Sequence, residues 1–176
     1  MQRRSLETRT RRPAEGVSGL RKTHALRERA SCLESSHPVS RKTMMLMLKP
    51  EFIDRVSEAE YRFCLLPDCD IVYFDGSDGP CFMTEHLRIR VGLKEGDDPV
   101  PLCYCFGFTE RDIREEVDKT GETTIPQRIR ALIKNGMCAC SAKNPSGACC
   151  LGEVNLTTKN LMREVIRESS NSDGEI

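Results

Sequence analysis

Residues 138–152 have the sequence CACSAKNPSGACCLG, which places four cysteines within thirteen residues around an Asn-Pro-Ser-Gly turn. Cys138 and Cys140 are separated by one residue, and Cys149 and Cys150 are adjacent. Adjacent cysteines bridge each other only in a strained ring, because an unstrained disulfide needs Cα atoms several ångströms apart. The stretch therefore favours metal binding or redox chemistry over a structural disulfide.

The whole chain has ten cysteines in 176 residues, with 5% aromatic residues and no Trp. A small domain with so few large apolar side chains needs additional stabilisation, which metal-bound cysteines can supply. The N-terminus is basic, but no apolar run of signal-peptide length follows it, and no stretch is long enough to span a membrane. We therefore expect a cytoplasmic protein without membrane insertion, in which clustered cysteines are metal ligands more often than disulfides.

Charge is concentrated at the N-terminus, where residues 1–42 carry eleven Lys and Arg against four Glu in a chain of net charge zero. A basic arm can bind nucleic acid, but this one lacks interleaved aromatic residues and an amphipathic period. We predict a disordered basic arm over residues 1–30, and we do not expect a nucleic-acid partner.

The next part of the chain has strand and turn signals. Residues 61–74, YRFCLLPDCDIVYF, place apolar and aromatic residues on both sides of a Cys-x4-Cys turn, which predicts a strand, a knuckle and a second strand. Residues 75–80 predict a tight reversal, and the alternation in 86–93, HLRIRVGL, predicts a half-buried strand. Residues 43–52, interrupted by a proline, are expected to form a short strand or an irregular packed segment. Together these signals predict a small antiparallel β unit over residues 31–97.

The period of the hydrophobic pattern changes from that of strands to that of helices after the linker at residues 94–101. Thr109 and Asp112 form a capping signature that opens a helix ending near Gly121. A second helix is expected from Thr123 or Thr124 to the stop at residues 135–136. The fold class is therefore α+β, with the β unit followed by a helical domain over residues 98–155.

The cysteines of the helical domain follow a regular pattern: C-x-C, thirty-two residues, C-x-C, eight residues, and C-C, from Cys103 to Cys150. A [2Fe–2S] cluster needs four thiolates, two for each iron. A zinc site uses the same ligand type, so spacing alone does not separate the two.

These residues resemble a known family. The segments CYCFGFTERDI and CACSAKNPSGACCLG are similar to the iron–sulfur domain of CopZ-type copper chaperones, and the helical pair resembles the bacterioferritin-associated ferredoxin fold. YRFCLLPDCDIVYF resembles the zinc-binding unit that precedes the iron–sulfur domain in that family. The resemblance extends from about Cys32 to Val154, and it implies two cofactors, zinc in the β unit and a [2Fe–2S] cluster in the helical domain.

The resemblance implies Cys32, Cys64 and Cys69 as zinc ligands. The family opens this unit with two cysteines in a C-P-x-C arrangement, whereas here Arg29 occupies the first position. A tetrahedral site then needs a fourth ligand, for which the candidates are His37, His24 and Cys81.

Six cysteines compete for the four positions of the cluster. We assign Cys103 and Cys105 first, then Cys138, because Gly136 ends the helix just before it, and Cys150 from the adjacent pair. Cys140 and Cys149 remain as alternates.

The family's copper-binding domain, with its Met-x-Cys-x-x-Cys loop, has no counterpart after Val154, where we expect a short helix and a polar tail over residues 156–176. We therefore predict an iron–sulfur and zinc-binding protein with a one-electron redox role in copper or other metal handling. Its partner would be a redox protein or a metal ion, with copper a candidate. The alternative is a cluster-stabilised adaptor or regulator without redox turnover. Because no nucleophile, phosphate-loop or HExxH motif is present, we do not expect an enzyme.

Overall fold

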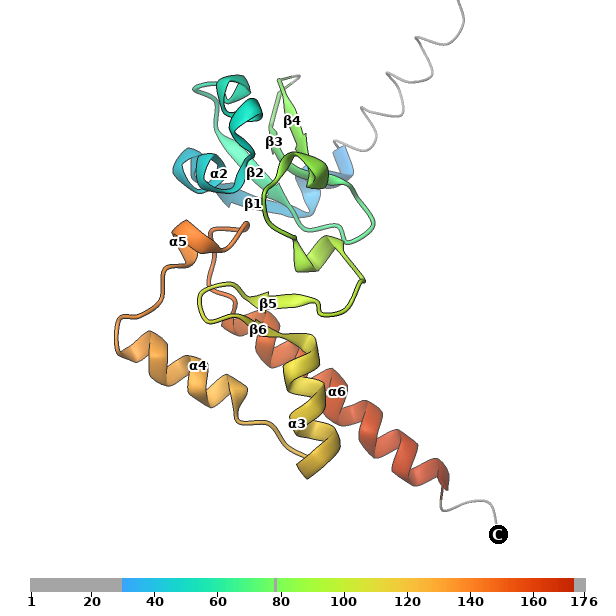
Figure 1. Ribbon diagram of the computed structural model, residues 1–176. Coiled ribbons are helices and arrows are strands. Elements are labelled where there is room, and N and C mark those ends of the chain that lie inside the picture. Colours follow the sequence, from blue (N-terminus) through green and yellow to red (C-terminus); the bar gives the residue numbers. More distant parts are fainter. Residues whose placement is uncertain (1–29, 78, 173–176) are drawn as a thin grey trace, which may run out of the picture.

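The computed structural model describes residues 30–77 and 79–172 (Figure 1). Apart from Ala30, the basic arm predicted over residues 1–30 lies outside the described residues. Figure 1 shows a β-sheet with short helices at one end of the molecule and three helices, α3, α4 and α6, at the other. The segment that contains α5 lies between them, so the cysteine-rich stretch is placed where the two parts meet.

The sheet has four antiparallel strands in the order in which they occur in the chain. These are β1 (Ser36–Val39), β2 (Tyr61–Cys64), β3 (Ile71–Asp75) and β4 (Cys81–Met83). The predicted strand, knuckle and strand over residues 61–74 are confirmed as β2, the Cys-x4-Cys turn and β3. The predicted reversal at 75–80 is confirmed as the turn between β3 and β4.

The expectation of a strand or irregular segment at residues 43–52 is wrong, because this part of the chain is helical. It forms α2 (Arg41–Met47) and the 3-10 helix η1 (Pro50–Arg55). Met and Leu have high helix propensity, and the Ser40 side chain caps α2 by accepting a hydrogen bond from the Thr43 N–H. The proline that interrupts the apolar run is the first residue of η1, a position where its missing N–H has no cost.

The strand predicted over residues 86–93 is also wrong, although its burial pattern is right. Two 3-10 helices, η2 (Thr84–His86) and η3 (Gly92–Lys94), flank a stretch with one isolated bridge, between Leu48 and Leu87. The backbone instead bonds to the end of α2, where the Arg88 N–H donates to the Met47 carbonyl at 2.9 Å. All four alternating residues still pack on the main core of the sheet: Leu87, Ile89, Val91 and Leu93.

One face of the sheet and α2 enclose that core, which contains two buried tyrosines and two buried phenylalanines. Its buried members are Val39, Met44, Met47, Leu48, Tyr61, Phe63, Val72, Tyr73, Phe82, Leu87 and Val91. A second, smaller cluster of buried residues holds Cys32, Cys64, Ile71 and Phe74. The β unit therefore has an apolar core of its own, with cysteines gathered apart from it.

The helical part begins with a two-stranded sheet that the sequence did not predict, β5 (Pro101–Cys103) and β6 (Phe108–Thr109). The predicted helices follow as α3 (Glu110–Thr120) and α4 (Ile125–Lys134). Thr109 forms the predicted capping box with Asp112, and Gly121 ends α3 in the left-handed conformation. The short helix α5 (Cys140–Lys143) was not predicted.

The last helix, α6 (Leu151–Ser172), is much longer than the short helix expected after residue 155, and the boundary predicted there falls inside it. Its buried residues Val154 and Leu161 belong to the same core as Ile113 and Val117 of α3 and Ile129 of α4. The segment is therefore part of the helical core rather than a polar tail. Among the helices of the described ranges, none has both the length and the apolar composition needed to cross a bilayer.

We predict that Glu116→Gln weakens the junction between α3 and α4. Glu116 Oε2 accepts hydrogen bonds from the Thr123 hydroxyl at 2.6 Å and the Thr124 N–H at 2.8 Å. The pKa of Glu116 is lowered, first by the Thr123 hydroxyl, so the carboxylate stabilises the fold above its ordinary pKa and this contribution is lost as pH falls through the lowered value. Because the side chain is 32% exposed, we expect a loss of about 0.5 to 1 kcal/mol in the free energy of unfolding at pH 7.

Chemical denaturation measures this loss. The difference between variant and parent should shrink toward acid pH, where the parent also loses its carboxylate. Glu115→Gln is the matched control, because Glu115 forms an exposed pair with Lys119 at 3.6 Å, and it should change stability by less than about 0.5 kcal/mol. Equal effects of the two substitutions would contradict the role of Glu116.

Candidate metal centres

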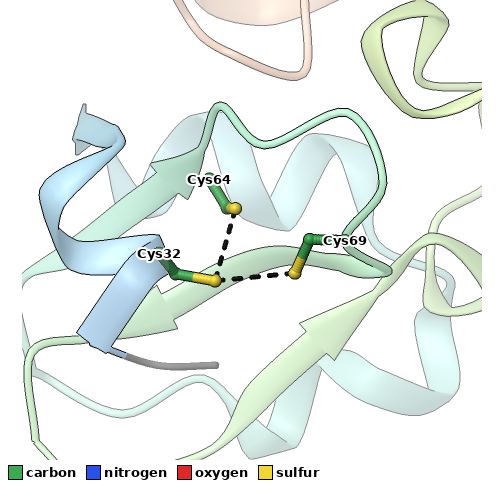
Figure 2. A group of neighbouring side chains, drawn as sticks. All are labelled: Cys32, Cys64 and Cys69. Atoms are coloured by element: carbon green, nitrogen blue, oxygen red, sulfur yellow. Dashed lines mark hydrogen bonds between the residues drawn. The ribbon is translucent and has the colours of Figure 1, made fainter. Parts of the chain in front are cut away.

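The first centre is a group of three thiols in the β unit (Figure 2). Cys32 Sγ lies 3.4 Å from Cys64 Sγ and 3.5 Å from Cys69 Sγ, and all three ligand atoms are within 4.8 Å of one another. Cys32 and Cys64 are fully buried, and Cys69 is half-buried. All three are free cysteines. The structure therefore brings together, as free thiols, the three residues that the resemblance implies as zinc ligands.

Three different elements supply these thiols. Cys32 lies in the helical stretch before β1, Cys64 ends β2, and Cys69 closes the knuckle between β2 and β3. The pairing of Ser36 with Cys64 brings the start of β1 beside the end of β2, and the Leu65 N–H donates to the Ser35 carbonyl at 2.8 Å. The knuckle lies beside a cavity of about 690 Å³, whose lining includes Cys69.

Burial and thiol neighbours keep Cys32 protonated in the absence of a cation. Burial, followed by hydrogen bonds with Cys64 and Cys69, raises the pKa of the Cys32 thiol far above its ordinary value. A divalent cation at the centre of the group would reverse this effect, because a coordinating thiol loses its proton. Ionisation of Cys32 is therefore coupled to metal binding at this site.

The structure does not bring His37 to this group, so its placement does not support His37 as the fourth ligand. His37 pairs with Phe63 in the ladder, one position along from the Ser36–Cys64 pair, so its side chain points to the other face of the sheet. There its Nε2 lies 2.9 Å from the Ser146 carbonyl oxygen, and its ring stacks on Phe63.

Cys81 remains a candidate fourth ligand. It pairs with Phe74 and packs against the small cluster that contains Cys32 and Cys64, but its sulfur is outside the group of three. His24 lies outside the described residues.

The second centre gathers cysteines from three segments of the helical part. Three sulfurs lie within reach of a common metal ion, those of Cys105, Cys138 and Cys140. Cys140 Sγ lies 3.2 Å from Cys138 Sγ and 3.6 Å from Cys105 Sγ. Beside this group, the buried Cys103 and Cys150 are hydrogen-bonded to each other. Five of the six cysteines predicted to compete for the cluster thus lie together, whereas Cys149 is exposed.

Local turns explain how these cysteines converge. The N–H of Gly107, which has φ of 74°, donates to the Cys103 carbonyl at 2.8 Å and closes the turn that contains Cys105. Gly136, with φ of 72°, turns the chain away from α4 so that Cys138 points back toward that turn. Cys150 immediately precedes α6, so the N-terminus of the longest described helix, with its unpaired amide groups, adjoins the thiols.

Hydrogen bonds to sulfur stabilise thiolates at this centre. The Cys150 thiol lowers the pKa of Cys103 to about 6, with further help from backbone groups of Phe106 and Cys105, whereas the same contact with Cys103 raises the pKa of Cys150. The pKa of Cys138 is likewise lowered, first by its hydrogen bond with Cys140. In each pair, therefore, the hydrogen bond favours the thiolate form of one cysteine, Cys103 in the first and Cys138 in the second.

A backbone amide also contacts the sulfur of Cys105. The Ala139 N–H donates to Cys105 Sγ at 3.3 Å, and this contact links the turn after β5 to the segment that carries Cys138 and Cys140. Amide hydrogen bonds to sulfur are the interactions that tune thiolate-bound metal clusters. The sequence could suggest this only indirectly, through the small residues around the cysteines.

Known proteins with this arrangement can now be identified. Residues 30–88 match the family model of a zinc binding domain of the CopZ type. The copper chaperone CopZ of Archaeoglobus fulgidus is 36% identical over 93 residues, which make up 53% of this chain and 43% of the chaperone. The chain thus spans less than half the length of that relative.

The X-ray structure of the Archaeoglobus fulgidus CopZ N-terminal domain is similar over 67% of this chain and 87% of that domain, with a TM-score of 0.54 and 30% sequence identity. The structural similarity covers 67% of the chain, which is more than residues 30–88 contain. It therefore extends beyond the β unit into the helical part. By sequence and fold together, this chain belongs to the family of CopZ-like N-terminal regions and binds metal.

Proposed function

We propose that this protein carries zinc in the β unit and a [2Fe–2S] cluster in the helical part, and that it serves as a one-electron redox component of copper or other metal handling. The observation that carries the proposal is the convergence of five cysteines at the second centre, with amide and thiol donors directed at their sulfurs. Such donors stabilise anionic thiolates, which are the form that iron–sulfur clusters require.

The thiol group of the β unit fits zinc. Zn–S bonds of about 2.3 Å in tetrahedral geometry place the sulfurs about 3.8 Å apart. The distances of 3.4 and 3.5 Å from the Cys32 sulfur are within reach of this value after a small expansion. Three thiolates leave one position for a further ligand, for which Cys81 is a candidate because it packs against the same small cluster.

The second centre fits a [2Fe–2S] cluster, which takes two thiolates for each iron. We propose Cys103 and Cys105 together with Cys138 and Cys150 as the ligands, and Cys140 as the alternate, because its sulfur lies in the same group. The exposure of Cys149 makes it the weakest of the six. When bound, the cluster would supply one-electron transfer, and the chain would supply burial, thiolate ionisation and amide donors.

The role in copper handling is supported by the relative that is described as a copper chaperone. The matched part is less than half of that chaperone, and we propose that the role in copper handling extends to this chain. We propose a redox and binding role rather than catalysis.

We predict a visible chromophore as the test of the cluster. Protein purified without oxygen should be red-brown and contain about two irons and two sulfides per chain. After reduction it should give a rhombic S = 1/2 EPR signal. A preparation that stays colourless after anaerobic reconstitution would exclude the cluster and leave zinc as the metal of both centres.

An adaptor without redox turnover is the second candidate. It is favoured by the burial of Cys103 and Cys150 within the helical core, where a cluster would reinforce a small core.

Mixing the reduced, cluster-loaded protein with Cu(II) distinguishes the redox role from the adaptor role. Cluster absorbance should report oxidation while a chelator traps Cu(I), and Cys140→Ser with Cys149→Ser controls for reduction by spare thiols. Oxidation no faster than that of an unrelated ferredoxin would favour the adaptor.

A further inference from the structure

Three side chains of the β unit hold the cysteine-rich segment through its backbone carbonyls. Tyr73 of β3 donates its hydroxyl to the Pro145 carbonyl at 2.7 Å. Thr43 of α2 donates its hydroxyl to the Ser141 carbonyl at 2.8 Å. His37 of β1 completes the set at 2.9 Å from the Ser146 carbonyl. The three contacts join positions 72 to 109 residues apart, from three different elements of the β unit.

In each of these contacts the side chain of the β unit is the donor and the carbonyl is the acceptor. A carbonyl oxygen only accepts, so His37 must carry its proton on Nε2. Burial raises the pKa of Tyr73 well above its ordinary value, so its hydroxyl stays protonated. The Thr43 hydroxyl also lies 2.7 Å from Ser40 Oγ, which can donate to it and leave the Thr43 proton for Ser141. Tyr73 and Thr43 are almost fully buried, and Pro145 is buried as well, so the Pro145 carbonyl would have no water to replace the Tyr73 hydroxyl.

The segment itself is folded to match this surface. The buried Asn144 side chain donates to the Ala148 carbonyl at 2.9 Å and accepts from the Ser146 N–H at 3.0 Å, which closes the Asn-Pro-Ser-Gly turn. Gly147 has φ of 69°, and a Cβ there would lie 3.3 Å from Thr43 Oγ1. A glycine therefore satisfies both the turn and the close approach to α2.

We propose that the β unit positions the second thiol centre: Tyr73, Thr43 and His37 hold residues 141–146 in the conformation that brings Cys140 and Cys150 to the other thiols. Cys140 immediately precedes this segment and Cys150 lies four residues after it, so fixing the segment restricts their separation. Ordering the thiols before metal arrives removes part of the conformational entropy cost of binding. The inference rests on the proposed function for its metal, but the docking is measurable without a metal at the second centre.

Hydrogen exchange of the zinc-loaded, cluster-free protein tests the docking. Tyr73→Phe and Thr43→Val should each speed amide exchange in residues 138–150 about fivefold to tenfold, the factor that one buried hydrogen bond corresponds to. Tyr61→Phe is the matched control, because Tyr61 is an equally buried tyrosine whose hydroxyl bonds to Ser57 within the β unit. Thr43→Ser retains the hydroxyl and should restore slow exchange.

Loaded protein tests the effect on the second centre. Iron transfer to a chelator should be faster by a similar factor in Tyr73→Phe, and visible circular dichroism of the cluster should change, with zinc content and Tyr61→Phe unaffected. If amide exchange in residues 138–150 is no faster in Tyr73→Phe than in the Tyr61→Phe control, the proposal is overturned even if the cluster binds. A chain that takes up no iron would instead overturn the proposed function, while hydrogen exchange still decides the docking.

Discussion

Cys64→Ser is expected to release zinc from the β unit and to cause a large loss of stability. Cys64 is fully buried and lies 3.4 Å from the Cys32 sulfur, so its loss leaves two of the three grouped thiols. A metal that binds only the folded state and is present at a thousand times its dissociation constant contributes about 4 kcal/mol. We expect a loss of that size, which corresponds to a fall of about 15 °C or more in Tm for a domain of this size.

Zinc analysis and thermal unfolding of purified variants measure both effects. Cys149→Ser, at an exposed cysteine of the other centre, should keep zinc and Tm unchanged. His37→Ala should also keep zinc, because the imidazole is bonded to the Ser146 carbonyl on the other face of the sheet. Loss of zinc in Cys81→Ser would identify the fourth ligand. If Cys64→Ser retained one zinc per chain, the assignment of the first centre would be wrong.

Gly92→Ala is expected to displace β5 and, with it, Cys103. A Cβ at Gly92 would lie 2.0 Å from the Pro101 carbonyl oxygen and 3.0 Å from its carbon, and both atoms are backbone, so the strand itself must move. The Gly92 N–H also donates to the Tyr104 hydroxyl at 2.8 Å. We expect a loss of about 2 to 3 kcal/mol, the range for overpacking a filled interior, and a lower iron content.

Gly96→Ala is the control for this substitution. A Cβ at Gly96 would meet no neighbouring atom within 4 Å, and the residue does not adopt a positive φ, so the change should be within about 0.5 kcal/mol of neutral. Denaturant unfolding together with iron and zinc analysis separates the outcomes. Gly92→Ala with parental stability and iron content would show that β5 moves without cost, and Cys103 would then not depend on this contact.

The sequence predicted those elements whose signals are local. The aromatic and β-branched residues around Cys64 and Cys69 predicted β2 and β3, and the capping residues Thr109 and Gly121 predicted the limits of α3. The run of Met and Leu in α2 was ambiguous, because apolar composition without a clear period suits a strand or a helix, and the Ser40 cap was the signal that could have decided it. The stripe of Val154, Thr158 and Leu161 would have revealed α6.

The candidate centres were predictable as sets of cysteines but not as arrangements. The resemblance implied Cys32, Cys64 and Cys69, whereas the placement of His37 depends on ladder register, because a shift of one residue changes the face on which a side chain lies. The pairing of Cys103 with Cys150 depends on how α6 packs on the rest of the helical part. Contacts such as that of Tyr73 with Pro145 join distant positions, and no local pattern encodes them.

The strand order of the β unit has a consequence for how the protein is made. Each strand pairs with the one just before it in the chain, so the sheet contains no crossover connection, which favours rapid formation. During synthesis the N-terminal part emerges first and folds as a unit. The sheet can therefore be complete before Cys138 leaves the ribosome, so that the last cysteines of the nascent chain meet a finished surface rather than an unfolded one.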